Sequence, residues 1–368
     1  MTESILNGIL IFGAIQAVFF SLLFVTKKNK ELPDKIIAIW LFFLAINTLT
    51  ILSAKFIDKE FLKVCQVSFT LIHGAFLYLY ARKLTINNAK FHKTDFLHFV
   101  PFIIAIIIGL LTINYGFNKQ KAINSIAITG IISGISYSVL VIYHLIKHNK
   151  KIKDNFSFTE KVNLNWLTNL TIGIFIIWLG GSLVGVLMRF FQYNIPIVWV
   201  FTVIPIFIFY IGFYGIKQNI IYSPNTKTTS KRTDLLIKSN SNKKGKYKKS
   251  GLQELSMKSI NDKLIYTMEK ELLFLNPTLS LSDLSEHLII PAHHITQTLN
   301  EYTKQSFYDF VNYYRVKEFK EKVFAPENSS FSLLGIAFDC GFNSKSSFNR
   351  IFKKHTGQSP SEFKASKK

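Results

Sequence analysis

The chain has 368 residues, enough for at least two domains, and 49% of them are hydrophobic. Its 44 Lys and Arg residues outnumber 22 Asp and Glu, and the net charge of +22 suits a partner such as DNA phosphate or anionic lipid. The two cysteines, Cys65 and Cys340, lie in unlike segments and form neither a disulfide framework nor a metal-ligand cluster. Phosphate-loop, His-Glu-x-x-His and serine-elbow motifs are absent, so we expect no enzyme, no cofactor and no metal site.

Residues 1–216 contain seven consecutive apolar stretches without interior Asp or Glu. A helix needs roughly 20 apolar residues to cross a bilayer core of about 30 Å, and helices of soluble cores are rarely uncharged for so long. We therefore predict a seven-span helical membrane bundle, whose first stretch is retained because it lacks the features of a cleaved signal peptide. The stretches are Ser4–Val25, Ile36–Ala54, Val64–Ala81, Phe96–Asn118, Ala122–Ile146, Val162–Met188 and Phe190–Ile216.

The loops between these stretches predict the orientation of the bundle. Thirteen Lys and Arg residues follow stretches one, three and five, and six lie in the opposite loops. Because basic loops stay in the cytoplasm, we expect the N-terminus outside and the C-terminal part inside. Aromatic residues near the stretch ends, which favour the membrane interface, are consistent with this: Trp40, Tyr80, Tyr143, Trp166, Tyr193 and Trp199.

Four polar residues lie inside the apolar stretches: Gln16, Asn47, His73 and Asn169. They could line a ligand pocket, since unpaired polar groups are costly in hydrocarbon, or they could form hydrogen bonds between helices. Small residues four apart, at Gly130–Gly134 and Gly181–Gly185, allow close helix contacts either within one bundle or in a homodimer.

Residues 217–250 are rich in Ser, Thr, Asn and Lys and show no apolar period, which predicts a flexible basic linker. The cluster at 243–249 could contact anionic lipid or DNA phosphate, or could simply be solvated.

Apolar residues recur with a helical period from Leu252, and this predicts an introductory helix ending before 276–277. Ser280 with Asp283 is a capping pair that begins a second helix, and after a short turn Pro291 begins a third at its first position. The predicted outward residues of that third helix are His293, His294, Gln297 and Asn300.

A longer helix is predicted at Phe307–Val323, and the paired pattern then repeats. Ser332 caps one helix, Gly341 provides the turn, and Ser344 caps a last helix that stops at Gly357. The outward residues of the last helix are Lys345, Ser346, Asn349, Arg350, Lys353 and Lys354. Two short helices joined by a tight turn can place the second one in a major groove, although spacing alone also fits a small structural domain.

A longer motif sharpens this interpretation. Residues 335–363 read GIAFDCGFNSKSSFNRIFKKHTGQSPSEF, with an Ile-Ala pair, a Gly-Phe turn, the run Phe-x-Arg-x-Phe-Lys, a Gly and a Pro. The motif resembles the signature of AraC-type transcription regulators, and 279–288 and 306–319 resemble the first unit and linking helix of that family. The resemblance covers 252–365 and implies two helix-turn-helix units that read successive turns of major groove. Pro291 and Gly335 depart from the family pattern, which often has a Ser or Thr cap and a better helix former there.

The expected protein is all-α, with a seven-span membrane domain at 1–216, a linker at 217–250 and an AraC-type DNA-binding domain at 251–368. Its predicted function is a sequence-specific transcription regulator in the cytoplasmic (inner) membrane of a bacterium, with double-stranded DNA and the lipid bilayer as partners. A homodimer, a small-molecule or envelope signal, and a purely anchoring membrane half remain open. The alternative is a transporter or channel-like protein with an appended DNA-binding domain, although no matching halves with broken helices are seen.

Overall fold

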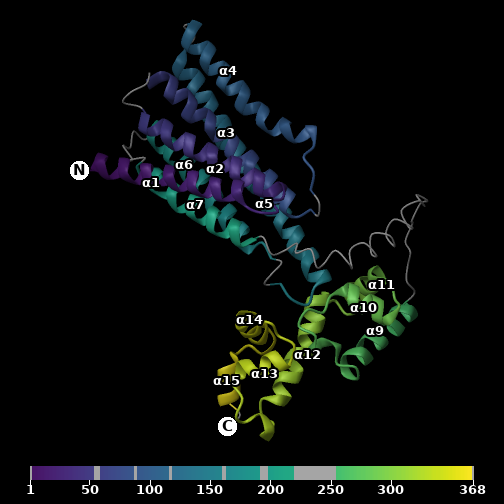
Figure 1. Cartoon of the computed structure of the whole chain (residues 1–368). Helices are drawn as coiled ribbons and strands as arrows, with labels where there is room; N and C mark the ends of the chain where they lie inside the picture. Colours follow the sequence, from purple (N-terminus) through teal and green to yellow (C-terminus); the bar gives the residue numbers. More distant parts are fainter. Residues whose placement is uncertain are drawn as a thin grey trace, which may run out of the picture. The chain divides into compact units, whose positions relative to one another are not determined.

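The computed structural model describes residues 2–53, 59–86, 89–115, 118–159, 163–190, 198–218 and 254–366 (Figure 1). Their regular structure is helical apart from one isolated antiparallel bridge between Phe156 and Ser280, so the described part of the chain is all-α as predicted. The chain divides into two compact units. The first comprises Met1–Lys147 and Leu164–Tyr222, and the second comprises His148–Asn163 and Ser223–Lys368.

The described part of the first unit is a helical bundle. Its helices are α1 (Thr2–Thr26), α2 (Leu32–Leu52), α3 (Lys59–Leu84), the 3-10 helix η2 (Lys93–Phe99), α4 (Val100–Tyr115), α5 (Lys119–Asn155), α6 (Asn165–Phe190) and α7 (Val198–Lys217). Helix α1 packs against α2 and α7, α3 packs against α2 and α4, and α6 packs against α7. Most helices begin and end near the predicted stretches, but α5 continues to Asn155, well past its predicted end at Ile146.

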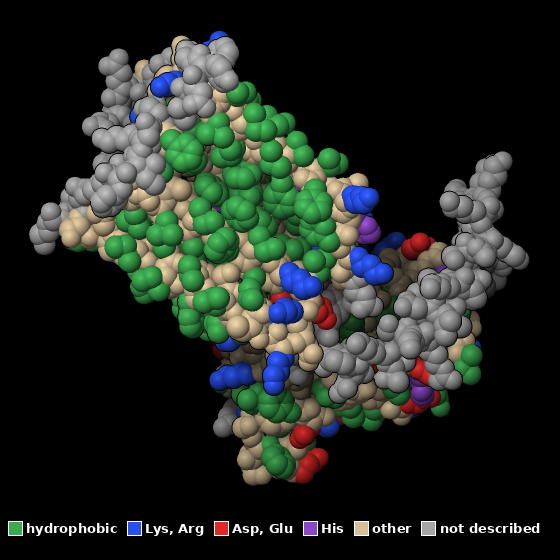
Figure 2. All heavy atoms as spheres, turned by 45° about the horizontal axis from the view of Figure 1, so that its top comes forward, with side chains coloured by type: hydrophobic (Ala, Val, Ile, Leu, Met, Phe, Trp, Pro, Cys, Tyr) green, Lys and Arg blue, Asp and Glu red, His purple; other side chains and the backbone are tan. Residues whose placement is uncertain are grey.

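Six helices of the described residues are long and apolar enough to cross a membrane. The side chains described for α7, from Val203 to Lys217, form a shorter apolar helix. Apolar side chains cover much of the surface of this unit in Figure 2. In α6, only 11% of the most apolar 18-residue stretch is buried inside the protein. Such a surface is costly in water and favourable in hydrocarbon. The apolar faces of α1, α4, α5 and α6 therefore suit contact with lipid.

A polar cluster joins α2 to α3 inside the bundle. Trp40 Nε1 donates a hydrogen bond to His73 Nδ1 at 3.3 Å, and Asn47 Nδ2 lies 3.1 Å from His73 Nε2. Asn47 and His73 thus contact each other between helices, in line with the hydrogen-bonding alternative. Trp40, Tyr80 and Trp166, predicted to lie at the membrane interface, are 2%, 2% and 8% exposed, so their side chains face the interior of the bundle and not its surface. Their rings pack into the apolar core of the bundle, whereas Tyr143 is exposed.

Basic residues at the helix ends are partly paired. Asp95 in η2 is fully buried, and its carboxylate lies 2.6 Å from Lys83 Nζ and 3.2 Å from Arg82 Nη1. Lys27 Nζ lies 2.6 Å from Asp34, which also accepts the backbone N–H of Glu31 in the capping box that begins α2. Because a buried charge needs such partners, the Asp95 pairs hold η2 against the end of α3, and the Lys27–Asp34 pair joins the segment after α1 to α2.

The second unit contains short helices and two longer ones, α9 and α12. They are α9 (Glu254–Glu269), η5 (Leu273–Leu275), α10 (Leu281–Leu288), α11 (Ala292–Gln297), the π-helix η6 (Thr298–Tyr302), α12 (Phe307–Lys322), η7 (Pro326–Asn328), α13 (Leu333–Asp339), α14 (Lys345–Thr356) and α15 (Pro360–Ala365). The introductory helix ends at Glu269, earlier than predicted, because Leu272 adopts a left-handed conformation and a 3-10 turn follows. The predicted linker lies almost entirely outside the described residues.

Two hydrophobic cores lie on either side of α12 in this unit. Phe310 and Tyr314 of α12 join a core built from α9, η5, α10 and α11, and Phe319 joins another built from α13, α14 and α15. The second core is aromatic: Phe319 lies 4.6 Å from Phe348 and 5.3 Å from Phe352 between ring centroids. Helix α12 therefore links two small helical bodies into one domain.

Helix α15 is a feature that the sequence analysis missed. The helix that stops at Gly357 was expected to be the last, but Ser359 and Glu362 form a capping box that begins a new helix at Pro360. Phe363 of α15 packs 5.3 Å from Phe352 between ring centroids and closes the second core. The capping pair Ser-x-x-Glu was visible in the sequence and could have predicted it.

Candidate nucleic-acid interface

The corner between α10 and α11 is built by local hydrogen bonds. Ser280 caps α10 by accepting the backbone N–H of Asp283 at 3.2 Å, and Asp283 accepts the backbone N–H of Ser280 in return. Ile289 ends α10 in a left-handed conformation, and the Ser285 hydroxyl donates to the carbonyl of Ile290 at 2.7 Å. Pro291 is the N-cap of α11, one residue before the helical position that was predicted for it.

Helix α11 presents polar residues on the face opposite its core contacts. Ile295 and Leu299 are buried at 0% and 1% exposure, whereas His293 and Asn300 are exposed and His294 and Gln297 are half-buried. Burial, and then the neighbouring His293, lower the pKa of His294 below its ordinary value, so this ring is neutral at neutral pH. Gln297 Nε2 donates to Glu301 at 3.1 Å. The four predicted residues thus include two freely accessible side chains and two that are partly covered.

The corner between α13 and α14 depends on a glycine. Ser332 caps α13 by accepting the backbone N–H of Gly335 at 3.0 Å, and Gly341 then reverses the chain with φ +86°. A Cβ atom at Gly341 would lie 2.4 Å from the carbonyl oxygen of Phe274, a contact that no side chain permits. Gly341 is therefore needed both for its backbone conformation and for its close approach to η5.

Helix α14 is capped at both ends and amphipathic. Ser344 accepts the backbone N–H of Ser347 at 3.1 Å, and Gly357 ends the helix with φ +80°. Phe348, Ile351 and Phe352 are buried. All six residues predicted to point outward on this helix are exposed: Lys345, Ser346, Asn349, Arg350, Lys353 and Lys354.

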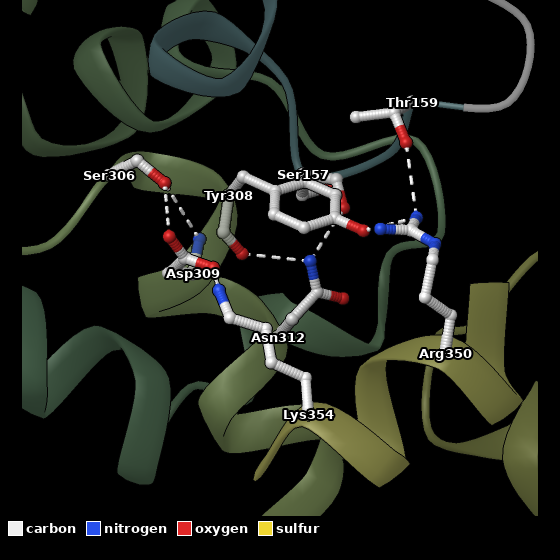
Figure 3. A network of polar contacts seen from close by, with 8 residues as sticks. All are labelled: Ser157, Thr159, Ser306, Tyr308, Asp309, Asn312, Arg350 and Lys354. Carbon is white, nitrogen blue, oxygen red and sulfur yellow. Dashed lines mark hydrogen bonds and ion pairs between the residues drawn. The ribbon is translucent and has the colours of Figure 1, made fainter. Parts of the chain in front are cut away.

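Two of these cations are held by α12, as Figure 3 shows. Arg350 Nη2 donates to the Tyr308 hydroxyl at 2.9 Å, and Lys354 Nζ lies 2.6 Å from Asp309 Oδ1. Burial acts to raise the pKa of Asp309, but hydrogen bonds from Lys354 and Ser306 and the charge of Lys354 outweigh it, so the pKa lies below its ordinary value. The exposed face of α14 thus carries several hydrogen-bond donors, and α12 holds two of them, Arg350 and Lys354, in place.

A second partner of Arg350 comes from a segment that was predicted only as a basic loop. Thr159, which precedes α6, accepts a hydrogen bond from Arg350 Nη2 at 3.4 Å (Figure 3). Ser157 accepts hydrogen bonds through its carbonyl from Asn312 at 3.0 Å and from Arg315 at 3.2 Å. The pair Phe156 and Phe158 in an otherwise Lys-rich loop was a signal for such docking.

The exposed groups of α11 and α14 are donors and acceptors of the kind that recognise DNA. Amide and guanidinium groups can bond to base edges, and Lys ammonium groups can bind phosphates. Among the described residues, no group of His, Cys, Asp and Glu is arranged to hold a metal ion.

Comparison with known proteins identifies the C-terminal part. Residues 284–366 match the family described as a helix-turn-helix domain, which is of the AraC type. This is a DNA-binding domain of transcription regulators and not an enzyme family. No curated protein and no solved structure matches the chain at a significant level.

Proposed function

We propose that this protein is a membrane-embedded, sequence-specific transcription regulator of the bacterial cytoplasmic membrane. Its membrane domain (1–216) crosses the bilayer seven times, with the N-terminus outside, and a basic linker (217–250) leads to the DNA-binding domain (251–368). The helix-turn-helix match at 284–366 supports DNA binding, and the apolar exposed surface of the first unit supports the membrane location.

The observation that carries the DNA-binding part is the repeated pair of short helices around α12. In each pair a serine-capped helix ends at a tight turn, and the second helix buries apolar residues while its other face stays polar. We infer that both pairs are helix-turn-helix units and that α11 and α14 enter successive major grooves. In the first pair the reading residues are His293, His294 and Gln297 of α11 and Asn300 of η6.

In α14, Lys345, Ser346, Asn349 and Arg350 lie in the first turns, which approach base edges when a helix enters the groove by its N-terminal end. Lys353 and Lys354 lie further along and suit phosphate contacts. Arg350 is the strongest candidate for base reading, because its guanidinium can form two parallel bonds to a guanine.

The second candidate function is a transporter or channel with an appended DNA-binding domain. Pro205 lies within α7, and transporters often have interrupted helices. The Trp40, His73 and Asn47 cluster favours the regulator, because its polar groups are used in contacts between helices rather than left to bind a solute.

Arg350→Ala tests the proposed interface in the full-length protein in lipid nanodiscs. We expect it to weaken binding by more than tenfold, because a bidentate contact to a base contributes about 1–3 kcal/mol. The measurement is fluorescence anisotropy with a duplex selected from a random-sequence library on the unmodified protein.

The matched control is Lys263→Ala, which removes one positive charge from the exposed face of α9, outside the proposed interface. We expect this variant to bind nearly as well as the unmodified protein. Equal affinity of Arg350→Ala and the unmodified protein would remove Arg350 from the interface, and failure to select any duplex would contradict the proposed function.

A further inference from the structure

Residues 155–159, called here the docking segment, connect membrane helices α5 and α6 but pack within the C-terminal unit. His148–Asn163 groups with the DNA-binding domain, although the rest of α5 and all of α6 belong to the first unit. The segment forms the antiparallel bridge between Phe156 and Ser280. It is therefore part of the DNA-binding domain in space and part of the membrane domain in sequence.

Ser157 anchors the docking segment and is 1% exposed. Its hydroxyl donates to the carbonyl of Leu279 at 2.6 Å and accepts from Arg315 Nη2 at 3.1 Å, and its backbone N–H also donates to Leu279 at 3.2 Å. Its carbonyl accepts from Asn312 and Arg315 of α12, which are 1% and 2% exposed. Buried donors left without acceptors are costly, so α12 holds a specific binding site for this segment.

Arg315 also ties this site to the remainder of the domain. Its Nε donates to the carbonyl of Phe274 at 2.8 Å and its Nη2 to that of Asn276 at 2.7 Å. The docking segment is thus bound where η5 meets α12, between the two hydrophobic cores.

The two ends of the docking segment reach the two helices that we propose to read DNA. Asn155 lines a shallow surface depression together with His293 and Gln297 of α11 and Asn300 of η6. At the other end, the Thr159 hydroxyl accepts a hydrogen bond from Arg350 of α14. A major groove about 12 Å wide admits one helix and leaves little space for another chain beside it.

We infer that the docking segment is an autoinhibitory element, which competes with DNA for the surface formed by α11 and α14. This inference rests on the proposed function. DNA and the segment bind the same side chains, so each must lower the apparent affinity of the other. Because the segment is continuous with α5 and α6, a change in the membrane helices that withdraws it raises DNA affinity.

A disulfide that locks the segment in place tests this inference. Paired residues of an antiparallel bridge have Cα atoms about 4.5–5.5 Å apart, within the range that a disulfide spans. We would therefore introduce Phe156→Cys with Ser280→Cys in the full-length protein in lipid nanodiscs. The DNA probe is a fluorescent duplex selected from a random-sequence library on the reduced form of this variant.

We expect oxidation to weaken binding of this duplex at least tenfold and reduction to restore it. The single variants Phe156→Cys and Ser280→Cys are the controls, since each retains Cys65 and Cys340 and the second also loses the α10 cap. Equal affinity of the oxidised and reduced double variant overturns the inference. Failure of the reduced form to select any duplex contradicts the proposed function itself, and the inference with it.

A milder variant tests the direction of the effect without a cross-link. Thr159→Val removes the hydroxyl that accepts from Arg350, and we expect DNA affinity to rise by up to about fivefold, the change that one such hydrogen bond supports. Thr129→Val in α5 is the matched control, because the Thr129 hydroxyl bonds only within its own helix, to Ser125, among the interactions described. Unchanged or lower affinity of Thr159→Val overturns the inference, lower affinity indicating that the segment supports DNA binding.

Discussion

Lys354 and Arg350 have partners within the domain before any DNA is present. Asp309 binds Lys354, and the Tyr308 hydroxyl binds Arg350, so both cations are oriented by the same turn of α12. Such pairing would reduce the conformational entropy that these long side chains lose if, as we propose, they bind a phosphate or a base. It also makes the stability of the interface depend on the charge of Asp309.

Asp309→Asn should therefore destabilise the protein in a pH-dependent way. The native pKa of Asp309 lies below the ordinary value of 3.8, because hydrogen bonds from Lys354 and Ser306 overcome the effect of burial. A lowered pKa stabilises the fold above the ordinary value, and this stabilisation is lost as the pH falls through the native pKa. We expect a lower unfolding temperature for the variant at about pH 7, and a difference that shrinks as the pH falls below 3.8 through the native pKa of Asp309.

Calorimetric unfolding of the purified full-length protein measures this difference. Glu327→Gln, which neutralises an exposed carboxylate in η7, is the control and should change the unfolding temperature little at either pH. A difference between Asp309→Asn and the unmodified protein that persists unchanged at low pH would show that packing, and not charge, is responsible.

At the scale of elements, two glycines that follow short helices allow the cost of a positive φ angle to be compared with the cost of a close packing contact. Gly341 and Gly357 have similar positive φ angles, +86° and +80°. An added Cβ meets the Phe274 carbonyl oxygen at 2.4 Å at Gly341 and meets nothing within 4 Å at Gly357. We expect Gly357→Ala to cost about 1–2 kcal/mol from its conformation alone, and Gly341→Ala to cost clearly more.

The comparison is made by chemical denaturation of the full-length variants. If Gly341→Ala is no more destabilising than Gly357→Ala, the α13–α14 corner can move away from η5 without cost. In that case the contact between the two halves of the domain at Phe274 is loose.

The helices of the C-terminal domain were largely predictable, because their ends carry local chemical signals. Ser280, Ser332, Ser344 and Gly357 act at the predicted positions through hydrogen bonds to neighbouring backbone atoms or through backbone conformation. The docking segment was not predictable in the same way. Ser157 binds Asn312 and Arg315 through its backbone carbonyl, which any residue could offer, so this part of the contact leaves no side-chain pattern in the sequence.

In the bundle, apolar length predicted the helices but not which residues face inward. Trp40 was expected at the membrane interface, yet its indole donates to His73 and its ring lies 6.5 Å from that of Phe76 between centroids. The choice between interface and core depends on neighbouring helices, and no single apolar stretch contains that information. The C-terminal end of α5 illustrates the same limit, since its polar extension to Asn155 belongs to the second unit.

At the scale of the whole molecule, the proposed function combined with the proposed outside N-terminus requires an odd number of membrane crossings. With the N-terminus outside, seven crossings place the DNA-binding domain in the cytoplasm, and six would place it outside, away from DNA. Six helices meet the length and hydropathy expected of a span, so the location of the domain depends on α7.

Reporter fusions in bacterial cells test this parity. We expect a reporter fused after Lys368 to be cytoplasmic, and one fused after Asn118, beyond α4, to be outside. Green fluorescence requires a cytoplasmic location, whereas alkaline phosphatase activity requires export, so the two reporters at each site provide opposite readouts. If both sites report an outside location, α7 does not cross the membrane and the DNA-binding domain cannot reach the chromosome. If Asn118 is inside and Lys368 outside, the basic loops have been assigned to the wrong side, and the regulator function falls with the orientation.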